Sequence, residues 1–331
     1  MSPGTKRILL VSGLIVAVLA ITGLFTGAIG AAFMSPDGDG HGILAKPSVH
    51  LPPQPLFPTD ARHHFEEFEE GHATRPFSNP MQFLVTNTLL SSWLTTIVLA
   101  ALFIFGTTRM KLVPRGIQNL LEIAIESLLS FIEGVVGKKH GRTFLPIIAT
   151  IFLFVAFNAW IGLLPIYPAL GWIKGDHVAV HLLRPAGTDL NMPLALALIS
   201  FVFVEFSGLR VLGLGYLTKF VRLGSLRRGL HDLIRGRMMT AFQGLLDFFF
   251  VGPLEAFSEC VRIVSFTFRL FGNMTAGEIL ILLSAFLVPF VATVGVYGLE
   301  ILVGFVQALI FAGLTLVFAS LAIAPHAEEN H

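Results

Sequence analysis

The sequence predicts an all-α, polytopic membrane protein with about five to six membrane helices. Hydrophobic residues make up 54% of the 331-residue chain. Charged residues make up only 13%, about half the share found in an ordinary soluble domain. Phe outnumbers Tyr by 31 to 3, and Phe is the aromatic residue that needs no polar partner. Because so little charge cannot cover a globular surface, this composition excludes a soluble enzyme.

Other simple features narrow the class further. The formal net charge is +1, without a broad basic face to neutralise phosphates, so nucleic-acid binding is not expected. The single cysteine, Cys260, cannot form an intramolecular disulfide, and we interpret it as a small buried hydrophobic residue. Gly134 and Gly137 stand too close together before Lys138 to form a phosphate-binding loop. We therefore expect no nucleotide, other cofactor or metal.

Six apolar stretches are long enough to cross a bilayer, which takes about 20 helical residues. They are residues 8–34, 84–106, 144–166, 193–212, 241–288 and 290–324. The first follows Lys6 and Arg7 and is either a signal peptide or an extra anchor; its length favours the anchor. The predicted regions are this N-terminal segment at residues 1–34, an extracytoplasmic His-rich and acidic loop at 35–80, and a membrane domain at 81–331.

The distribution of basic residues sets the predicted orientation. Few lie in residues 35–83 and 167–192: Lys46, Arg62, Arg75, Lys174 and Arg184. Many lie in residues 107–143 and 210–240: Arg109, Lys111, Arg115, Lys138, Lys139, Arg142, Arg210, Lys219, Arg222, Arg227, Arg228, Arg235 and Arg237. Because basic loops stay on the cytoplasmic side, both termini are predicted to be cytoplasmic if the first segment is retained.

Two segments outside the spans each have two interpretations. His63, His64 and His72 could bind a metal, but a solvated acidic loop is the simpler interpretation of this charged run. Residues 114–136 begin with a proline, which is favourable at the start of a helix. Their polar stripe is Gln118, Glu122, Glu126 and Glu133. This pattern predicts an amphipathic helix at the cytoplasmic interface, with an ordinary connecting helix as the alternative.

Charged residues inside the fifth apolar stretch are the main functional indication. Arg269 lies far inside it, and an Arg near the bilayer centre costs about 2.5–3.5 kcal/mol. Because Arg keeps its proton in proteins, this cation needs a carboxylate, water or both. An Arg paired for packing, or reaching to the interface, is the alternative. Nearby polar residues recur at helical spacing, which predicts one polar face: Glu255, Ser258, Glu259, Arg262, Ser265 and Asn273.

The last two stretches are predicted to form an antiparallel hairpin of long, tilted helices. A turn at residues 288–290, where a proline stands, places Arg269 level with Gln307 and Glu278 level with Glu300. Two carboxylates at one level cannot both ionise cheaply, so at least one should exchange protons near neutral pH.

This arrangement predicts two polar half-pathways separated by a fixed cation. Glu278 and Glu300 lie toward the outer side, while Glu255 and Glu259 lie toward the cytoplasmic side. The fixed charge of Arg269 would block direct proton passage and attract a mobile carboxylate from a partner.

These two stretches are too long for upright helices. At 1.5 Å per residue they would measure about 72 Å and 52 Å, against a hydrocarbon thickness of about 30 Å. We expect them either to break, near Gly252-Pro253 or Gly272, or to lie steeply inclined.

Two motifs in this region resemble the a subunit of the F-type rotary ATP synthase. They are Phe268-Arg269-Leu270-Phe271-Gly272-Asn273-Met274-Thr275-Ala276-Gly277-Glu278 and Gln307-Ala308-Leu309-Ile310-Phe311. Asn158 with Gly162-Leu163-Leu164-Pro165, and Thr188-Asp189-Leu190-Asn191, extend the resemblance in matching order.

The resemblance implies a non-catalytic, proton-translocating stator subunit that couples proton flow to ATP synthesis. Arg269 would separate two half-channels at the interface with the c-ring. The outer half-channel would contain Asn273, Glu278, Glu300 and Gln307. The cytoplasmic one would contain Glu255 and Glu259, with Arg262 and Ser265 on the same face.

The same resemblance implies partners and a location. The partners would be the c-ring proteolipid subunits, b-type peripheral stalk subunits, the soluble ATPase sector through the complex, and the lipid bilayer. The location would be a bacterial-type plasma (inner) membrane, with several membrane passes. Some members of the family pair Glu with His at the two outer positions, whereas both are Glu here, at Glu278 and Glu300.

A secondary transporter with a mid-membrane Arg/Glu site is the main alternative function. Such a protein should show internal repeats with paired broken helices, whereas the polar residues here cluster in the last quarter of the chain. An intramembrane enzyme would need a convergent nucleophile and base, but all eleven His residues lie outside the predicted spans.

Overall fold

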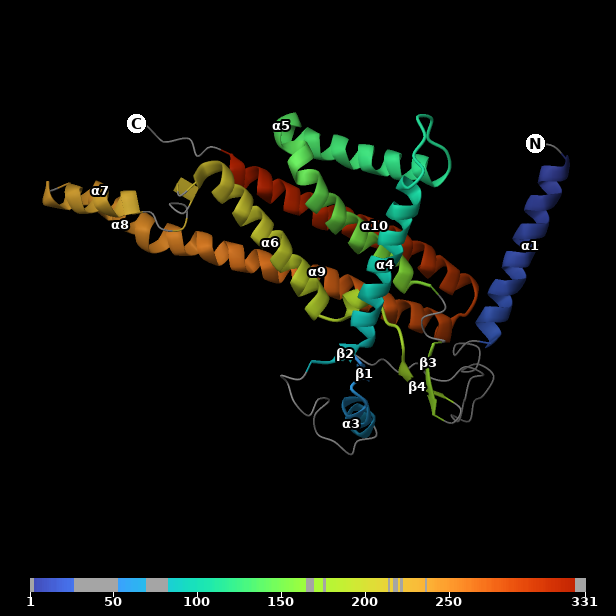
Figure 1. The fold of residues 1–331 in the computed structure, drawn as a ribbon. Helices are drawn as coiled ribbons and strands as arrows, with labels where there is room; N and C mark the ends of the chain where they lie inside the picture. The colour runs from blue at the N-terminus through green and yellow to red at the C-terminus, as the bar shows by residue number, and fades with distance from the viewer. Residues whose placement is uncertain are drawn as a thin grey trace. The chain divides into compact units, whose positions relative to one another are not determined.

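The computed structural model describes residues 3–26, 53–69, 83–164, 170–174, 177–213, 215–216, 220, 223–235 and 237–324. The chain divides into two compact units. The first unit comprises Met1–Thr96, Ala156–Asp189 and Phe271–Gln307, and the second comprises Ile97–Val155, Leu190–Leu270 and Ala308–His331. Four helices, α4, α5, α9 and α10, contribute residues to both units (Figure 1).

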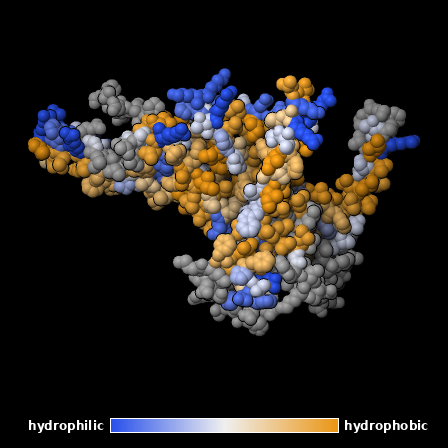
Figure 2. All heavy atoms as spheres, in the orientation of Figure 1, coloured by the Kyte–Doolittle hydropathy of each residue, from blue (hydrophilic) through white to orange (hydrophobic). Residues whose placement is uncertain are grey.

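Long apolar helices dominate the described residues, which confirms an all-α membrane protein. Within the part of the chain that the structure describes, five stretches are long and apolar enough to cross a membrane: α4 (Asn87–Thr107), α5 (Ile117–Gly162), α6 (Asn191–Leu212), Met238–Leu287 and α10 (Val291–Ile323). Helix α1 (Pro3–Thr26) contains a shorter apolar stretch, Leu10–Leu24. Figure 2 shows hydrophobic residues over most of the visible face of the long helices.

Glycine 137 divides α5 into an amphipathic part and an apolar part. It has φ 76° and ψ 162°, a left-handed backbone conformation that glycine adopts without a Cβ clash. The change of direction in α5 is visible in Figure 1. Separate helices were predicted for residues 114–136 and 144–166, and both are present. The first begins at Ile117, after Gly116, which also has positive φ (63°).

The fifth apolar stretch is a nearly continuous helical rod with one local irregularity. Helix α8 (Met238–Leu246) runs into a π-helical turn at Asp247–Val251, and α9 (Gly252–Leu287) follows. Pro253 explains the π turn, because it has no N–H to bond the carbonyl four residues earlier. Gly272, the other break that we considered, lies inside α9 without interrupting it. Helices α9 and α10 are about 54 Å and 50 Å long, so they must incline to stay within hydrocarbon about 30 Å thick.

Helices α9 and α10 form the predicted antiparallel hairpin. Helix α9 ends at Leu287 and α10 begins at Val291, with positive φ at Phe290 (69°) in the turn. In the first unit, the Asn273 side chain bonds Gln307, while Gly277 lies against Glu300. In the second unit, Phe266 contacts both Phe311 and Phe318. In these contacts, a higher residue number on α9 is paired with a lower residue number on α10. The two helices therefore run antiparallel.

Short strands and turns border the helices of the first unit. Strands β1 (Pro55–Phe57) and β2 (Val85–Thr86) pair antiparallel, as do β3 (Gly171–Lys174) and β4 (His177–His181). Helix α3 (Thr59–Glu69) follows β1, and a 3₁₀ turn at Ala186–Thr188 precedes α6. The buried Asn87 accepts a bond from the Gln54 backbone and donates one to the His181 carbonyl. These bonds tie the start of α4 to both strand pairs.

Aromatic and small residues pack the helices of the second unit. Phe144 of α5 meets Phe203 of α6 edge-on, with ring centroids 5.2 Å apart. Ser200 of α6 and Thr315 of α10 share a buried hydrogen bond of 2.7 Å. Helix α7 (Leu223–Ile234) packs on α8 through Gly229 and Gly244, where a Cβ at Gly244 would stand 2.8 Å from the Gly229 Cα. These contacts hold α5 to α6, α6 to α10 and α7 to α8.

Candidate functional site

Each unit contains a cluster of buried polar side chains, and α9 supplies residues to both clusters. In the first unit, Arg184 and Glu278 form an ion pair. The Arg184 Nη2 lies 2.8 Å from Glu278 Oε2, and its Nε lies 3.2 Å and 3.3 Å from the two carboxylate oxygens. The side chains are 8% and 24% exposed. Because two guanidinium nitrogens contact the carboxylate, the contact sets the orientation of the carboxylate as well as balancing its negative charge.

Arg184 is also held through its backbone. Its N–H donates to Ser91 Oγ on α4 at 3.1 Å, and Ser91 itself donates to the Asn87 carbonyl. Both Ser91 and Arg184 are buried. The cation therefore stands in a fixed position, on a segment that links α4 to the 3₁₀ turn before α6.

The second outer carboxylate, Glu300, lies beside the residue that precedes Glu278. A Cβ added to Gly277 would stand 2.6 Å from the Glu300 Cδ and 2.9 Å from its Oε1. The hairpin register therefore brings Glu300 and Glu278 to one level, as predicted. Within the described residues, no hydrogen bond or ion pair joins Glu300 to another side chain.

Asn273 and Gln307 complete the polar groups predicted for the outer side. The Asn273 Nδ2 donates to Gln307 Oε1 at 2.7 Å. Gln307 is buried, whereas Asn273 is exposed. Close packing around this pair comes from Gly187, where a Cβ would meet the Met274 side chain at 2.7 Å. Arg269 belongs to the second unit, so its predicted level with Gln307 stays a prediction.

Arg269 is half-buried near the end of the α9 segment in the second unit. Its guanidinium carbon lies 5.8 Å from the centroid of the Phe266 ring. Among the residues that the structure describes, no carboxylate forms an ion pair with Arg269. A guanidinium over an aromatic face gains a modest cation–π attraction, which does not replace a counter-ion.

Glu259 and Arg262 form the main ion pair of the second unit. The Arg262 Nη2 donates to Glu259 Oε1 at 2.8 Å, and its Nη1 lies 2.6 Å from Glu259 Oε2. The Arg262 guanidinium also stacks on Phe318 of α10, 3.7 Å from the ring centroid. Glu259 is only 4% exposed. The pair is therefore turned into the helix bundle.

Tyr216 extends this cluster to α6. It is 2% exposed, and its ring lies on Gly208, where a Cβ would come within 2.5 Å of the ring. Burial, together with the charge and hydrogen bond of Glu205, raises the pKa of Tyr216 far above its ordinary value. Glu259 adds to this effect and Arg262 opposes it. The Tyr216 hydroxyl is therefore neutral, and the charges of Glu205 and Glu259 contribute to this state.

The single polar face expected along α9 is divided into two. Glu259 is buried and Glu255 and Arg262 are half-buried, whereas Ser258 and Ser265 are exposed. The reason is the helical period: positions 255, 259, 262 and 266 share the less exposed side of α9, where Arg262 and Phe266 contact α10, and positions 258, 261, 265 and 268 lie on the exposed side. Cys260 is also exposed, so its interpretation as a buried residue was wrong.

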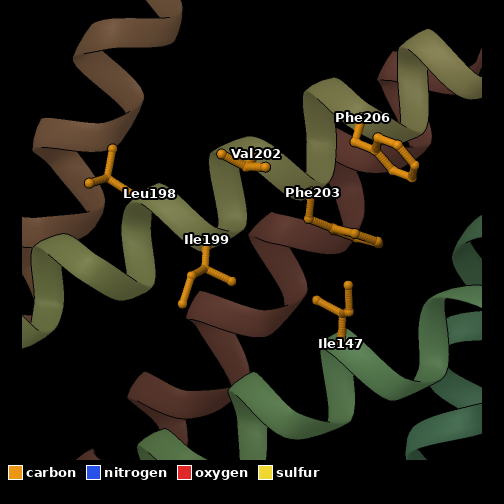
Figure 3. A pocket seen from close by; sticks show the side chains of 6 residues that line it. All are labelled: Ile147, Leu198, Ile199, Val202, Phe203 and Phe206. Carbon is orange, nitrogen blue, oxygen red and sulfur yellow. The ribbon is translucent and has the colours of Figure 1, made fainter.

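Two other features contribute no chemistry to the site. The structure describes His63 and His64 but not His72, and among its described residues no group of three His, Cys, Asp or Glu side chains could hold a metal. A groove of about 370 Å³ between α5 and α6 is lined entirely by apolar side chains, which Figure 3 shows as sticks. Its lining residues are Ile147, Leu198, Ile199, Val202, Phe203 and Phe206.

The sequence did not point to three residues of these clusters. Arg184 was counted only as a basic residue of an outer loop, and Glu205 and Tyr216 were not singled out. Glu205 had a usable signal, since it is a carboxylate inside an apolar span. Arg184 had none, because its partner Glu278 is 94 residues away.

The helices and their buried charges define a class, the multi-pass membrane proteins that hold ionisable groups inside the bundle. Residues 89–320 match the family described as ATP synthase A chain. Relatives named ATP synthase subunit a include one from Gloeobacter violaceus, 32% identical over 74% of this chain and 86% of the relative. Another, from Campylobacter jejuni subsp. doylei, is 32% identical over 72% of this chain and 89% of the relative.

The chain therefore belongs to the ATP synthase A chain family. Membership in this family implies a role in ATP synthesis and proton transport at a membrane, as a subunit of the ATP synthase complex.

Proposed function

We propose that this chain provides two proton half-channels at the interface with the c-ring of a rotary ATP synthase, separated by Arg269. The observation that carries the proposal is the half-buried Arg269, which has no ion-pair partner among the described residues. A permanent cation inside a membrane helix needs an anion. A carboxylate on a neighbouring rotor subunit would supply it.

The surface of α9 supports a protein partner beside Arg269. Residues exposed along one side of this helix recur at helical spacing and are mostly apolar: Leu254, Phe257, Val261, Val264 and Phe268. Ser258 and Ser265 are exposed among them. Lipid tails offer these hydroxyls no hydrogen bond, whereas a helical partner can. The proteolipid ring is the partner that fits this mixed, elongated surface.

The two polar clusters are the proposed half-channels. On the outer side, Asn273, Glu278, Glu300 and Gln307 would bring a proton to the rotor carboxylate. The rotor would then carry the neutral carboxyl around the ring. Arg269 would favour the ionised form when that carboxyl returns. The released proton would leave past the cytoplasmic group: Glu255, Glu259, Arg262 and Ser265.

The remaining assignments follow the same proposal. The chain would be a non-catalytic subunit of a bacterial-type inner membrane, in contact with b-type stalk subunits and, through the complex, with the soluble ATPase sector. The basic residues of segments 107–143 and 210–240 support cytoplasmic termini, because basic loops stay on the cytoplasmic side. Residues 1–34 would be an anchor or signal peptide, 35–80 an outer loop, and 81–331 the membrane domain.

The test compares Arg269→Ala with the native chain in assembled complexes in sealed vesicles. An imposed proton gradient drives ATP synthesis, which the variant should abolish while still assembling; a passive proton leak would also show that Arg269 insulates the half-channels. Arg115→Ala is the control, because it removes an exposed cation outside the spans and should leave synthesis unchanged. Native-level synthesis by Arg269→Ala would refute the proposal.

A further inference from the structure

We propose that Arg184 is a positioning residue of the outer half-channel, and that its ion pair with Glu278 leaves Glu300 as the proton-carrying carboxylate. This inference rests on the proposed function, because it assigns separate roles within one half-channel. The two glutamates, which the sequence treats as equivalent, have different surroundings.

The surroundings of Glu278 favour a permanent anion. Three nitrogen–oxygen contacts of 2.8–3.3 Å join it to the buried Arg184 guanidinium. A proton on Glu278 would remove the negative charge that these three contacts bring to the buried guanidinium, and breaking a buried charge pair is unfavourable. The guanidinium cannot compensate by losing its own proton.

The surroundings of Glu300 favour exchange of a proton. Its carboxylate lies against the backbone of Gly277, and within the described residues it makes no ion pair or hydrogen bond. Gaining or losing a proton there breaks no existing interaction. Among the described residues, Glu278 on α9 lies at the level of Glu300, and Arg184, before the 3₁₀ turn, neutralises the charge of Glu278.

The charge balance of the site then has a simple form. With Arg184 and Glu278 paired, the three groups Arg184, Glu278 and Glu300 are together neutral when Glu300 holds a proton, and they carry one negative charge when it does not. Removing Arg184 would place two unpaired carboxylates at one level, so they would share protons instead. Arg184 therefore determines which carboxylate carries the proton, without carrying one itself.

The experiment uses assembled complexes in vesicles and follows ATP synthesis as the pH on the outer side is varied. Glu300→Gln should abolish synthesis. Arg184→Gln should lower the rate of ATP synthesis by about tenfold or more, because Glu278 and Arg184 act as a pair. The dependence of synthesis on outer pH should also change, because Glu278 would then share protons with Glu300. The double variant Arg184→Gln/Glu278→Gln should recover most of that loss, because it removes both charges together. Arg184→Lys, which keeps the charge, should retain more synthesis than Arg184→Gln.

Three outcomes would overturn the inference. Glu278 would be the proton carrier if the double variant stayed as low as Arg184→Gln while assembling normally. Native-level synthesis by Arg184→Gln would remove any positioning role, as would an unchanged pH profile with reduced synthesis. Glu126→Gln, which removes an exposed carboxylate of α5, is the control. The proposed function is tested separately, because Arg269→Ala can abolish synthesis whichever glutamate carries the proton.

Discussion

Gly277→Ala tests whether the position of the Glu300 carboxylate matters. A Cβ at residue 277 would stand 2.6 Å from the Glu300 Cδ, whereas ordinary van der Waals contact begins at 3.4 Å. The Glu300 Oε2 atom is closer still, so the carboxylate would have to move by at least the difference between these distances, about 0.8 Å. Because it is the far end of a flexible side chain, it can move while the helices stay in place.

The expected cost falls on function and not on stability. Turning Glu300 away from its rotamer costs about 1 kcal/mol, and replacing a helical Gly by Ala returns up to about 1 kcal/mol. Assembly should therefore be nearly normal. A misplacement of about 1 Å at a reacting group can cost roughly 100-fold in rate. We expect ATP synthesis to fall by about 10- to 100-fold.

The assay is proton-driven ATP synthesis by assembled complexes in vesicles, normalised to the amount of assembled complex. Gly295→Ala is the matched control in α10, because nothing lies within 4 Å of its added Cβ. Glu300→Asp, whose side chain is one methylene shorter, should partly rescue Gly277→Ala by withdrawing the carboxylate. Native-level synthesis by Gly277→Ala would refute the reasoning, since it would show that proton transfer tolerates a displaced carboxylate.

Two further predictions concern the second unit. The raised pKa of Tyr216 keeps its phenol neutral in the folded protein, so its tyrosinate absorbance should appear at higher pH than that of an ordinary tyrosine; a Tyr216→Phe difference titration with an ordinary midpoint would contradict this. Gly208→Ala should lower the free energy of unfolding by about 1–3 kcal/mol, and with it the melting temperature, through overpacking. The reason is that the added Cβ would come within 2.5 Å of the Tyr216 ring. Gly134→Ala, with open space around it, is the control in a thermal-unfolding assay, and equal melting temperatures would refute the prediction.

The apolar pattern of the sequence determined the membrane helices and the hairpin. The second, fourth and sixth apolar stretches match α4, α6 and α10 closely, because a membrane span depends mainly on the length and hydropathy of one segment. Pro289 predicted the position of the turn between the last two helices. Glu278 and Glu300 are spaced evenly about that turn, so they lie at one level.

Tertiary structure alone decided which charged groups from distant parts of the chain are brought together. Arg184 and Glu278 are 94 residues apart in sequence. They form an ion pair because the segment that carries Arg184 folds back against α4 and α9. The contact of Tyr216 with Glu205 depends likewise on the chain after α6 returning to that helix at Gly208. Hydropathy and helical spacing describe one segment at a time, whereas a buried charge is set by the neighbours that other segments bring to it.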